Sequence, residues 1–120
     1  MRVLAKLVLV FLGSWLSLTA SAGSNHAFMT AGQLVQYCVS QDQRSIAFCE
    51  GYILAINDTV VGGYLSDQIG ICYPKGLKPA DLRSEVVGYL VRNNGLQSYI
   101  AEGPVAEALS AAFPCENPPQ

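Results

Sequence analysis

The chain has 120 residues, enough for one domain, with nine acidic residues, seven basic residues and 51% hydrophobic residues. A formal net charge of −2 gives no electrostatic basis for binding nucleic acid or an anionic lipid surface. Neither class of partner is therefore expected.

The first 22 residues have the three-part layout of a secretory signal peptide. Arg2 and Lys6 precede an apolar run over residues 7–18, and Ala20-Ser21-Ala22 offers small residues where a signal peptidase cleaves. The run is shorter than the roughly 20 apolar residues that a membrane span needs. We expect cleavage after Ala22 and export to the periplasm. The mature chain then keeps five basic and nine acidic residues, a net charge near −4.

Residues 23–29 are expected to form a flexible arm ahead of the first helix. Thr30 and Gln33 have the spacing of a capping box, in which each side chain accepts a hydrogen bond from the backbone N–H of the other residue. This signature predicts a helix over residues 31–39.

A second, longer helix is predicted from the clearest periodic signal in the chain. Its N-cap is either Ser40 or Asp42, and Gly62-Gly63 mark its end. Between them apolar residues recur every three or four positions, as on one face of an amphipathic helix: Ile46, Cys49, Ile53, Ile56 and Val60.

Four other positions on this helix need separate interpretation. Gly51 and Ala55 are one turn apart, and their small side chains predict close packing against another helix of the domain. Tyr52 is expected in the core with its hydroxyl at a wet edge. Asp58 lies late in the helix, where a carboxylate opposes the helix dipole and needs compensation. An internal hydrogen bond or ion pair is the simpler explanation for Asp58, and an exposed contact to a bound protein is the functional one.

The second half of the chain predicts a loop over residues 64–76 and two further helices. Pro79 fits the first turn of a third helix, which Asn93-Asn94-Gly95 ends. A last helix is expected to start near Pro104, because a proline inside a helix costs about 3 kcal/mol. Residues 116–120 are expected to be disordered. The predicted fold class is all-α, a small disulfide-stapled bundle of four to five helices.

The four cysteines indicate two disulfides, because an even number in an exported chain is typical of a disulfide framework. Cys38 ends the first helix and Cys49 begins the second, so an antiparallel hairpin would bring them face to face. This favours Cys38–Cys49 together with Cys72–Cys115, although the sequence alone leaves all three connectivities possible. No cysteines have metal-site spacing and His26 stands alone, so neither a metal nor another cofactor is expected.

An enzyme is not expected either. The chain has one histidine, no nucleophile motif of the G-x-S-x-G type and no glycine-rich loop that would bind phosphate. Cysteines committed to disulfides leave no thiol nucleophile.

Several short motifs together resemble the Rap/Tai family of type VI secretion amidase immunity proteins, over residues 30–115. They are Cys38, Cys49-Glu50-Gly51-Tyr52-Ile53, Asp58, Cys72-Tyr73-Pro74, Val86-Val87-Gly88-Tyr89-Leu90 and Phe113-Pro114-Cys115. The resemblance implies a periplasmic helical protein that binds a peptidoglycan amidase and blocks its active-site cleft. It also implies a possible homodimer. The chain departs from the family pattern at Ala55 and at Asn94-Gly95.

A projecting element is needed to enter such a cleft, and the loop over residues 62–70 is the candidate. Tyr64, Leu65 and Asp67 offer an aromatic, an aliphatic and a charged contact, and aromatic anchors often carry most of the energy of an interface. With Asp58 they form the set of candidate partner-binding residues. The simpler interpretation of the loop is a connector. Two other functions also stay open, an envelope accessory domain with an unrelated partner and an HdeA-like acid-stress chaperone.

Overall fold

The computed structural model describes residues 28–63 and 70–116. In these ranges the chain forms α1 (Ala31–Cys38), α2 (Gln43–Val61), α3 (Pro79–Arg92), the short 3-10 helix η1 (Asn94–Ser98) and α4 (Glu102–Ala112). The described residues form no β-strand and contain only two isolated antiparallel bridges. The predicted all-α bundle is therefore confirmed. The predicted signal peptide lies outside the described residues.

The capping box at the start of α1 is formed as predicted. Thr30 Oγ1 accepts a hydrogen bond of 3.2 Å from the Gln33 N–H, and Gln33 Oε1 accepts one of 2.9 Å from the Thr30 N–H. The Ala31 N–H also donates to the Tyr99 carbonyl at 2.9 Å, and the Ala101 N–H donates to the Met29 carbonyl at 3.1 Å. The beginning of α1 is thereby joined to the segment that precedes α4.

Asp42, rather than Ser40, caps the start of α2. Its carboxylate accepts hydrogen bonds of 3.0 Å from both the backbone N–H and the hydroxyl of Ser45. These bonds favour the charged form, so they lower the pKa of Asp42 below its ordinary value. Ser40 supports the cap, because its hydroxyl accepts a hydrogen bond from the Asp42 N–H.

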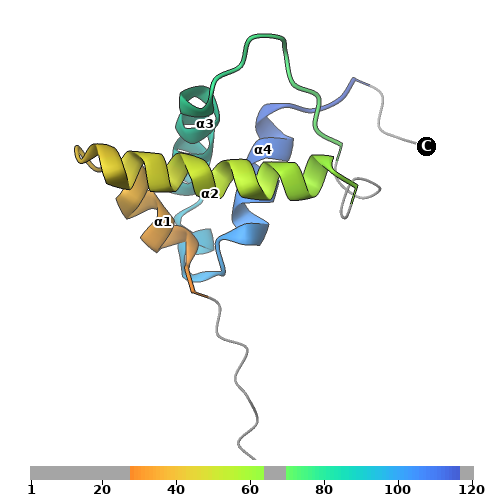
Figure 1. Ribbon diagram of the computed structural model, residues 1–120. Coiled ribbons are helices and arrows are strands. Elements are labelled where there is room, and N and C mark those ends of the chain that lie inside the picture. The colour runs from red at the N-terminus through yellow and green to blue at the C-terminus, as the bar shows by residue number, and fades with distance from the viewer. Residues whose placement is uncertain (1–27, 64–69, 117–120) are drawn as a thin grey trace, which may run out of the picture.

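The long helix α2 holds the bundle together. It lies across the molecule and contacts α1, α3 and α4 (Figure 1). Three members of its predicted apolar stripe, Cys49, Ile53 and Val60, are buried, and Ile56 packs beside them. One core cluster joins the four helices, and its largest fully buried side chains are Leu34, Ile53, Val86, Leu90, Val105 and Leu109.

The last helix begins two residues before the predicted start. α4 runs from Glu102, and Pro104 is buried in its first turn. The sequence predicts only that the helix starts near Pro104, and the structure places this proline at the third helical residue. The N–H groups of the whole first turn lack partners inside the helix, so a missing N–H is tolerated at the third position as well. The regular hydrogen bonds of α4 begin with the Val105 N–H, which donates to the Ala101 carbonyl at 3.0 Å.

Both disulfides form in the connectivity that the sequence favours. Cys38 pairs with Cys49 across the α1–α2 turn, with a Cα–Cα distance of 5.1 Å. Cys72 pairs with Cys115 at a Cα–Cα distance of 4.9 Å. The first disulfide lies in the core, while the second joins the segment before α3 to the residues after α4.

Candidate partner-binding site

The candidate contact Asp58 lies in the last turn of α2, and its side chain is exposed. Its Oδ1 atom accepts a hydrogen bond of 3.2 Å from the side-chain amide of the neighbouring Asn57. The structure therefore contains an internal hydrogen bond of the kind expected from the sequence. Among the described residues Asp58 forms no ion pair, so its charge faces solvent and opposes the helix dipole. Within the described residues this carboxylate is exposed and its charge is not balanced by a cation.

A short polar chain joins the end of α2 to the segment that follows residue 69. The Tyr73 hydroxyl donates to the side-chain carbonyl of Asn57, whose amide donates in turn to Asp58. Burial, and then the nearby Asp58 carboxylate, raise the pKa of the Tyr73 hydroxyl. Tyr73 therefore stays protonated and remains a hydrogen-bond donor at physiological pH.

The same segment is also fixed to the end of α4. The Cys72–Cys115 disulfide is accompanied by a hydrogen bond of 2.9 Å from the Cys72 N–H to the Phe113 carbonyl. An antiparallel bridge pairs Ile71 with Pro114, and the rings of Tyr73 and Phe113 lie 4.9 Å apart. Residues 70–73 therefore have a fixed position relative to α2 and α4. We call this arrangement, residues 57–58, 70–73 and 113–115, the loop base.

Two glycines set the direction in which the chain leaves α2. Gly62 caps the helix, and its N–H donates to the Asp58 carbonyl at 2.8 Å. A Cβ atom at position 62 would lie 2.5 Å from that carbonyl oxygen, which is too close for any side chain. Gly63 has a φ of 109°, a conformation that glycine adopts without strain. The helical path of α2 therefore ends at these two glycines.

Three of the four partner-binding residues predicted from the sequence, Tyr64, Leu65 and Asp67, lie outside the described residues. The structure does place the fourth, Asp58, in the loop base. It also shows a hydrogen bond between Tyr73 and Asn57, a contact that the sequence does not predict. Sixteen residues separate them, and no spacing rule connects a loop tyrosine with a helix asparagine at that distance.

The predicted packing role of Gly51 and Ala55 is wrong. Both residues are exposed, and a Cβ atom built at Gly51 would meet no other atom within 4 Å. The buried stripe of α2 contains Cys49 and Ile53, so positions 51 and 55 fall on the opposite side of the helix. No helix of the described chain covers this outer face.

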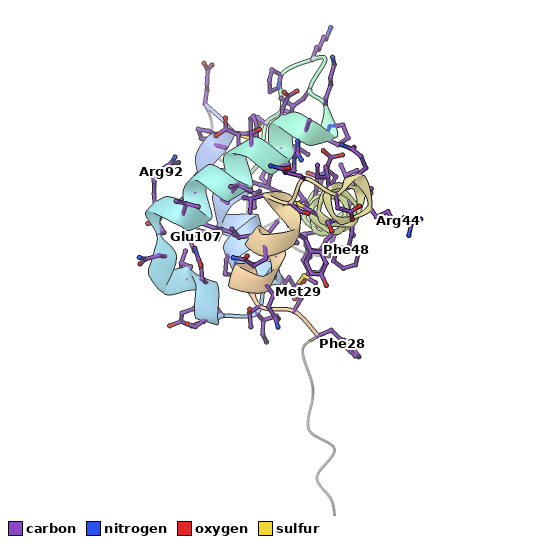
Figure 2. The ribbon with its side chains drawn as sticks, turned by 90° about the vertical axis from the view of Figure 1, so that its left-hand side faces the viewer. Phe28, Met29, Arg44, Phe48, Arg92 and Glu107 are labelled. Atoms are coloured by element: carbon purple, nitrogen blue, oxygen red, sulfur yellow. A yellow bond between two sulfur atoms is a disulfide. The ribbon has the colours of Figure 1, made fainter. Side chains whose placement is uncertain are left out.

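An exposed aromatic pair, Tyr37 of α1 and Phe48 of α2, also escaped the sequence analysis. Their ring centroids are 4.8 Å apart, and the two side chains are 41% and 48% exposed. Figure 2 shows Phe48 on the side of the molecule opposite Glu107. The sequence does contain a signal that Phe48 is exposed, because this large apolar residue lies next to the buried stripe of α2 but outside its period.

The described residues meet neither the requirements of a metal site nor those of a membrane-spanning helix. Within residues 28–63 and 70–116, no three histidine, cysteine or acidic side chains are grouped so that they could hold a metal ion. No helix in those ranges is long and apolar enough to cross a membrane. All four cysteines form disulfides. The described features that a partner could contact are the loop base and exposed surfaces such as the Tyr37–Phe48 pair.

Comparison with known proteins identifies the family. The model of the Rap1a immunity proteins matches residues 30–115. No curated protein and no solved structure matches the chain. The matched range contains every described helix, both disulfides and the loop base. The chain belongs to the family of Rap1a immunity proteins.

Proposed function

We propose that this chain is an exported immunity protein that binds and blocks a peptidoglycan amidase delivered by a type VI secretion system. The observation that carries the proposal is the family match over residues 30–115, which spans the whole helical bundle. Immunity proteins act by binding a protein effector, and the family is generally not enzymatic. The amidase, and the periplasm as the place of action, follow from the family resemblance and from the signal-peptide pattern of residues 1–22.

The loop base supports a role for residues 62–70 as the element that enters the amidase cleft. A segment that must fill a cleft loses less conformational entropy on binding when both of its ends are already fixed. Here one end is fixed by the cap of α2, and the other by the Cys72–Cys115 disulfide and the Tyr73–Asn57 hydrogen bond. We propose that Tyr64 and Leu65 supply the buried anchors and that Asp67 and Asp58 supply charged contacts at the rim.

The proposed inhibition is steric. Amidases of this kind use a Cys–His pair, so a segment seated over that pair excludes the peptide substrate. The cysteines of this chain are held in disulfides, and no covalent bond to the amidase is required. The family resemblance also implies a homodimer, which sedimentation analysis of the exported protein tests directly.

The test is to purify the exported protein together with an amidase encoded beside its gene, and to measure peptidoglycan cleavage. We expect a stable complex and loss of amidase activity at equimolar protein. Tyr64→Ala and Leu65→Ala should each weaken binding about 30-fold, as expected for anchor residues at the centre of an interface. Asp58→Asn, which keeps the acceptor oxygen but removes the charge, should weaken binding less.

The matched control is Glu85→Gln, which removes an exposed charge from α3, outside the loop base. It should leave inhibition unchanged. A protein that forms no complex with such an amidase, or that inhibits equally well after both loop substitutions, would contradict the proposal. Sequencing the N-terminus of the exported protein tests the predicted cleavage, which leaves Gly23 as the first residue.

A further inference from the structure

A groove runs along one face of α4, beside α3. Its lining residues on α4 are adjacent pairs that repeat every four positions, so they occupy one face of the helix. Tyr89 of α3 forms the facing wall. The groove has a volume of about 590 Å³ and is lined by Tyr89, Glu102, Gly103, Ala106, Glu107, Ser110 and Ala111. It is hollow because the side chains on the α4 face between the two glutamates are small.

A second hollow of about 520 Å³ continues this groove around the first turns of α4. The two hollows share Glu102, Gly103 and Glu107. The second adds Tyr99 and Ile100, whose side chains are 62% and 56% exposed. We call the combined surface the α4 groove. Exposed aromatic and aliphatic side chains such as Tyr99 and Ile100 are frequent where a surface meets another protein.

The charge of the α4 groove has one sign. From residue 93 to the end, the chain contains three glutamates and no lysine, arginine or histidine. The one ion pair among the described residues, Arg83 with Glu50, lies elsewhere. Arg92, one turn beyond Tyr89 on α3, is the basic residue nearest to the groove in sequence, and it pairs with neither groove glutamate. The groove carboxylates are therefore not neutralised within the described chain.

One groove carboxylate, that of Glu107, is oriented by a neighbouring residue. The Tyr89 hydroxyl donates a hydrogen bond of 2.6 Å to Glu107 Oε1, which joins α3 to α4 through this carboxylate. That bond raises the pKa of the Tyr89 hydroxyl. The charge of Glu102 extends to Tyr52 of α2, where burial and then this charge raise the pKa of the Tyr52 hydroxyl. A carboxylate has about four acceptor sites, so the bond from Tyr89 leaves Glu107 able to accept further donors.

We propose that the α4 groove binds a cationic segment of the effector protein, separately from the loop that enters the cleft. Lysine or arginine side chains of the effector would reach Glu102 and Glu107, with their aliphatic stems over Gly103 and Ala106 and an apolar neighbour against Ile100. The choice of occupant follows from charge complementarity, since two unneutralised carboxylates flank an apolar floor. The identity of that protein rests on the proposed function, whereas the preference for a cationic segment rests on the groove alone.

The test uses the exported protein, uniformly labelled with ¹⁵N, and two synthetic amphipathic peptides of 12 residues. One peptide has lysine at every fourth position among alanine and leucine, and the other has glutamine in place of each lysine. We expect the lysine peptide to shift the amide signals of residues 99–107 and to lose this effect at high salt. The glutamine peptide should bind at least about tenfold more weakly, because it offers no partner to the two carboxylates.

The double variant Glu102→Gln with Glu107→Gln tests the two carboxylates directly. Glutamine can still accept the hydrogen bond from Tyr89, so the fold is kept while both charges are removed. This variant should bind the lysine peptide about tenfold more weakly. The matched control is Glu85→Gln with Glu116→Gln, which removes the same number of charges from positions outside the groove and should bind as the unaltered protein does.

Three results would overturn the proposal: equal binding of both peptides, shifts that map outside residues 99–107, or full affinity in the groove variant. The proposed function fails separately. If the lysine peptide binds the groove but the protein forms no complex with an amidase, the groove proposal is supported and the proposed function is wrong. If the protein inhibits an amidase and the substitutions of Glu102 and Glu107 change nothing, the proposed function is supported and the groove proposal is wrong.

Discussion

Gly51 lies in the middle of α2, with an exposed position and open space where a side chain would be. A glycine inside a helix costs stability because it loses more backbone entropy on folding than any other residue. Its presence on an uncovered helix face therefore has no explanation in the packing of the described chain. Close approach of another molecule to this face of α2 would explain why position 51 is a glycine.

Gly51→Ala should stabilise the protein by about 0.5–1 kcal/mol, because alanine favours the helix and meets no other atom. Urea unfolding followed by circular dichroism measures the change. The matched control is Gly62→Ala, which should destabilise the protein, since its Cβ atom would collide with the Asp58 carbonyl oxygen. Loss of stability in Gly51→Ala would mean that something covers the outer face of α2 in solution.

The two disulfides join different elements, so stability and the proposed recognition by the loop base can be tested separately. Cys38–Cys49 closes the α1–α2 turn over a sequence separation of 11 residues, whereas Cys72–Cys115 spans 43 residues and forms part of the loop base. By the chain-entropy model they stabilise the fold by about 3 and about 4 kcal/mol. The loop base depends directly only on the second.

Replacing both cysteines of one disulfide by serine should therefore give two distinct outcomes. Cys72→Ser with Cys115→Ser should lower both the free energy of unfolding and the affinity for the proposed amidase partner. Cys38→Ser with Cys49→Ser should lower the free energy of unfolding while the folded fraction keeps its affinity. Denaturant titration and calorimetric binding measure the two quantities. Equal losses of affinity in both variants would show that the loop base has no special role.

Local signals predicted most of the elements. The Thr30–Gln33 capping box, the apolar period of α2 and Pro79 at the start of α3 all depend on residues within a few positions of one another. The sequence does not predict the 3-10 helix over residues 94–98, because Asn93-Asn94-Gly95 indicates a helix break and the residues after it indicate only a short turn. The loop base and the α4 groove could not be predicted either. They depend on contacts such as Tyr73–Asn57 and Tyr89–Glu107, which join separate helices or loops.

At the scale of the whole molecule, the core contains almost nothing that acid could protonate. No polar or charged side chain among the described residues is buried, and the Arg83–Glu50 pair lies near the surface. Asp42 is the carboxylate whose pKa is lowered by folding. Its contribution to stability is complete above the ordinary value of 3.8 and is lost as the pH falls through the lowered pKa.

We therefore expect the fold to persist at pH 2 with a modest loss of stability. The fluorescence of a dye that binds exposed apolar surface should rise little between pH 7 and pH 2, and the helical circular dichroism spectrum should be kept. An acid-stress chaperone that loosens at low pH would give a large rise in dye fluorescence. That result would favour the chaperone interpretation over the immunity protein. Asp42→Asn should reduce the remaining difference in thermal stability between the two pH values.

The two sequence separations, 11 residues for Cys38–Cys49 and 43 for Cys72–Cys115, have a consequence for the order of oxidative folding. Cys38 and Cys49 face each other across one helical hairpin, so local structure is enough to bring their sulfur atoms together. Cys72 and Cys115 lie on either side of α3 and α4, so their bond has to wait until those helices have packed. An intermediate with one disulfide would therefore carry a linked α1–α2 hairpin but an untethered loop base.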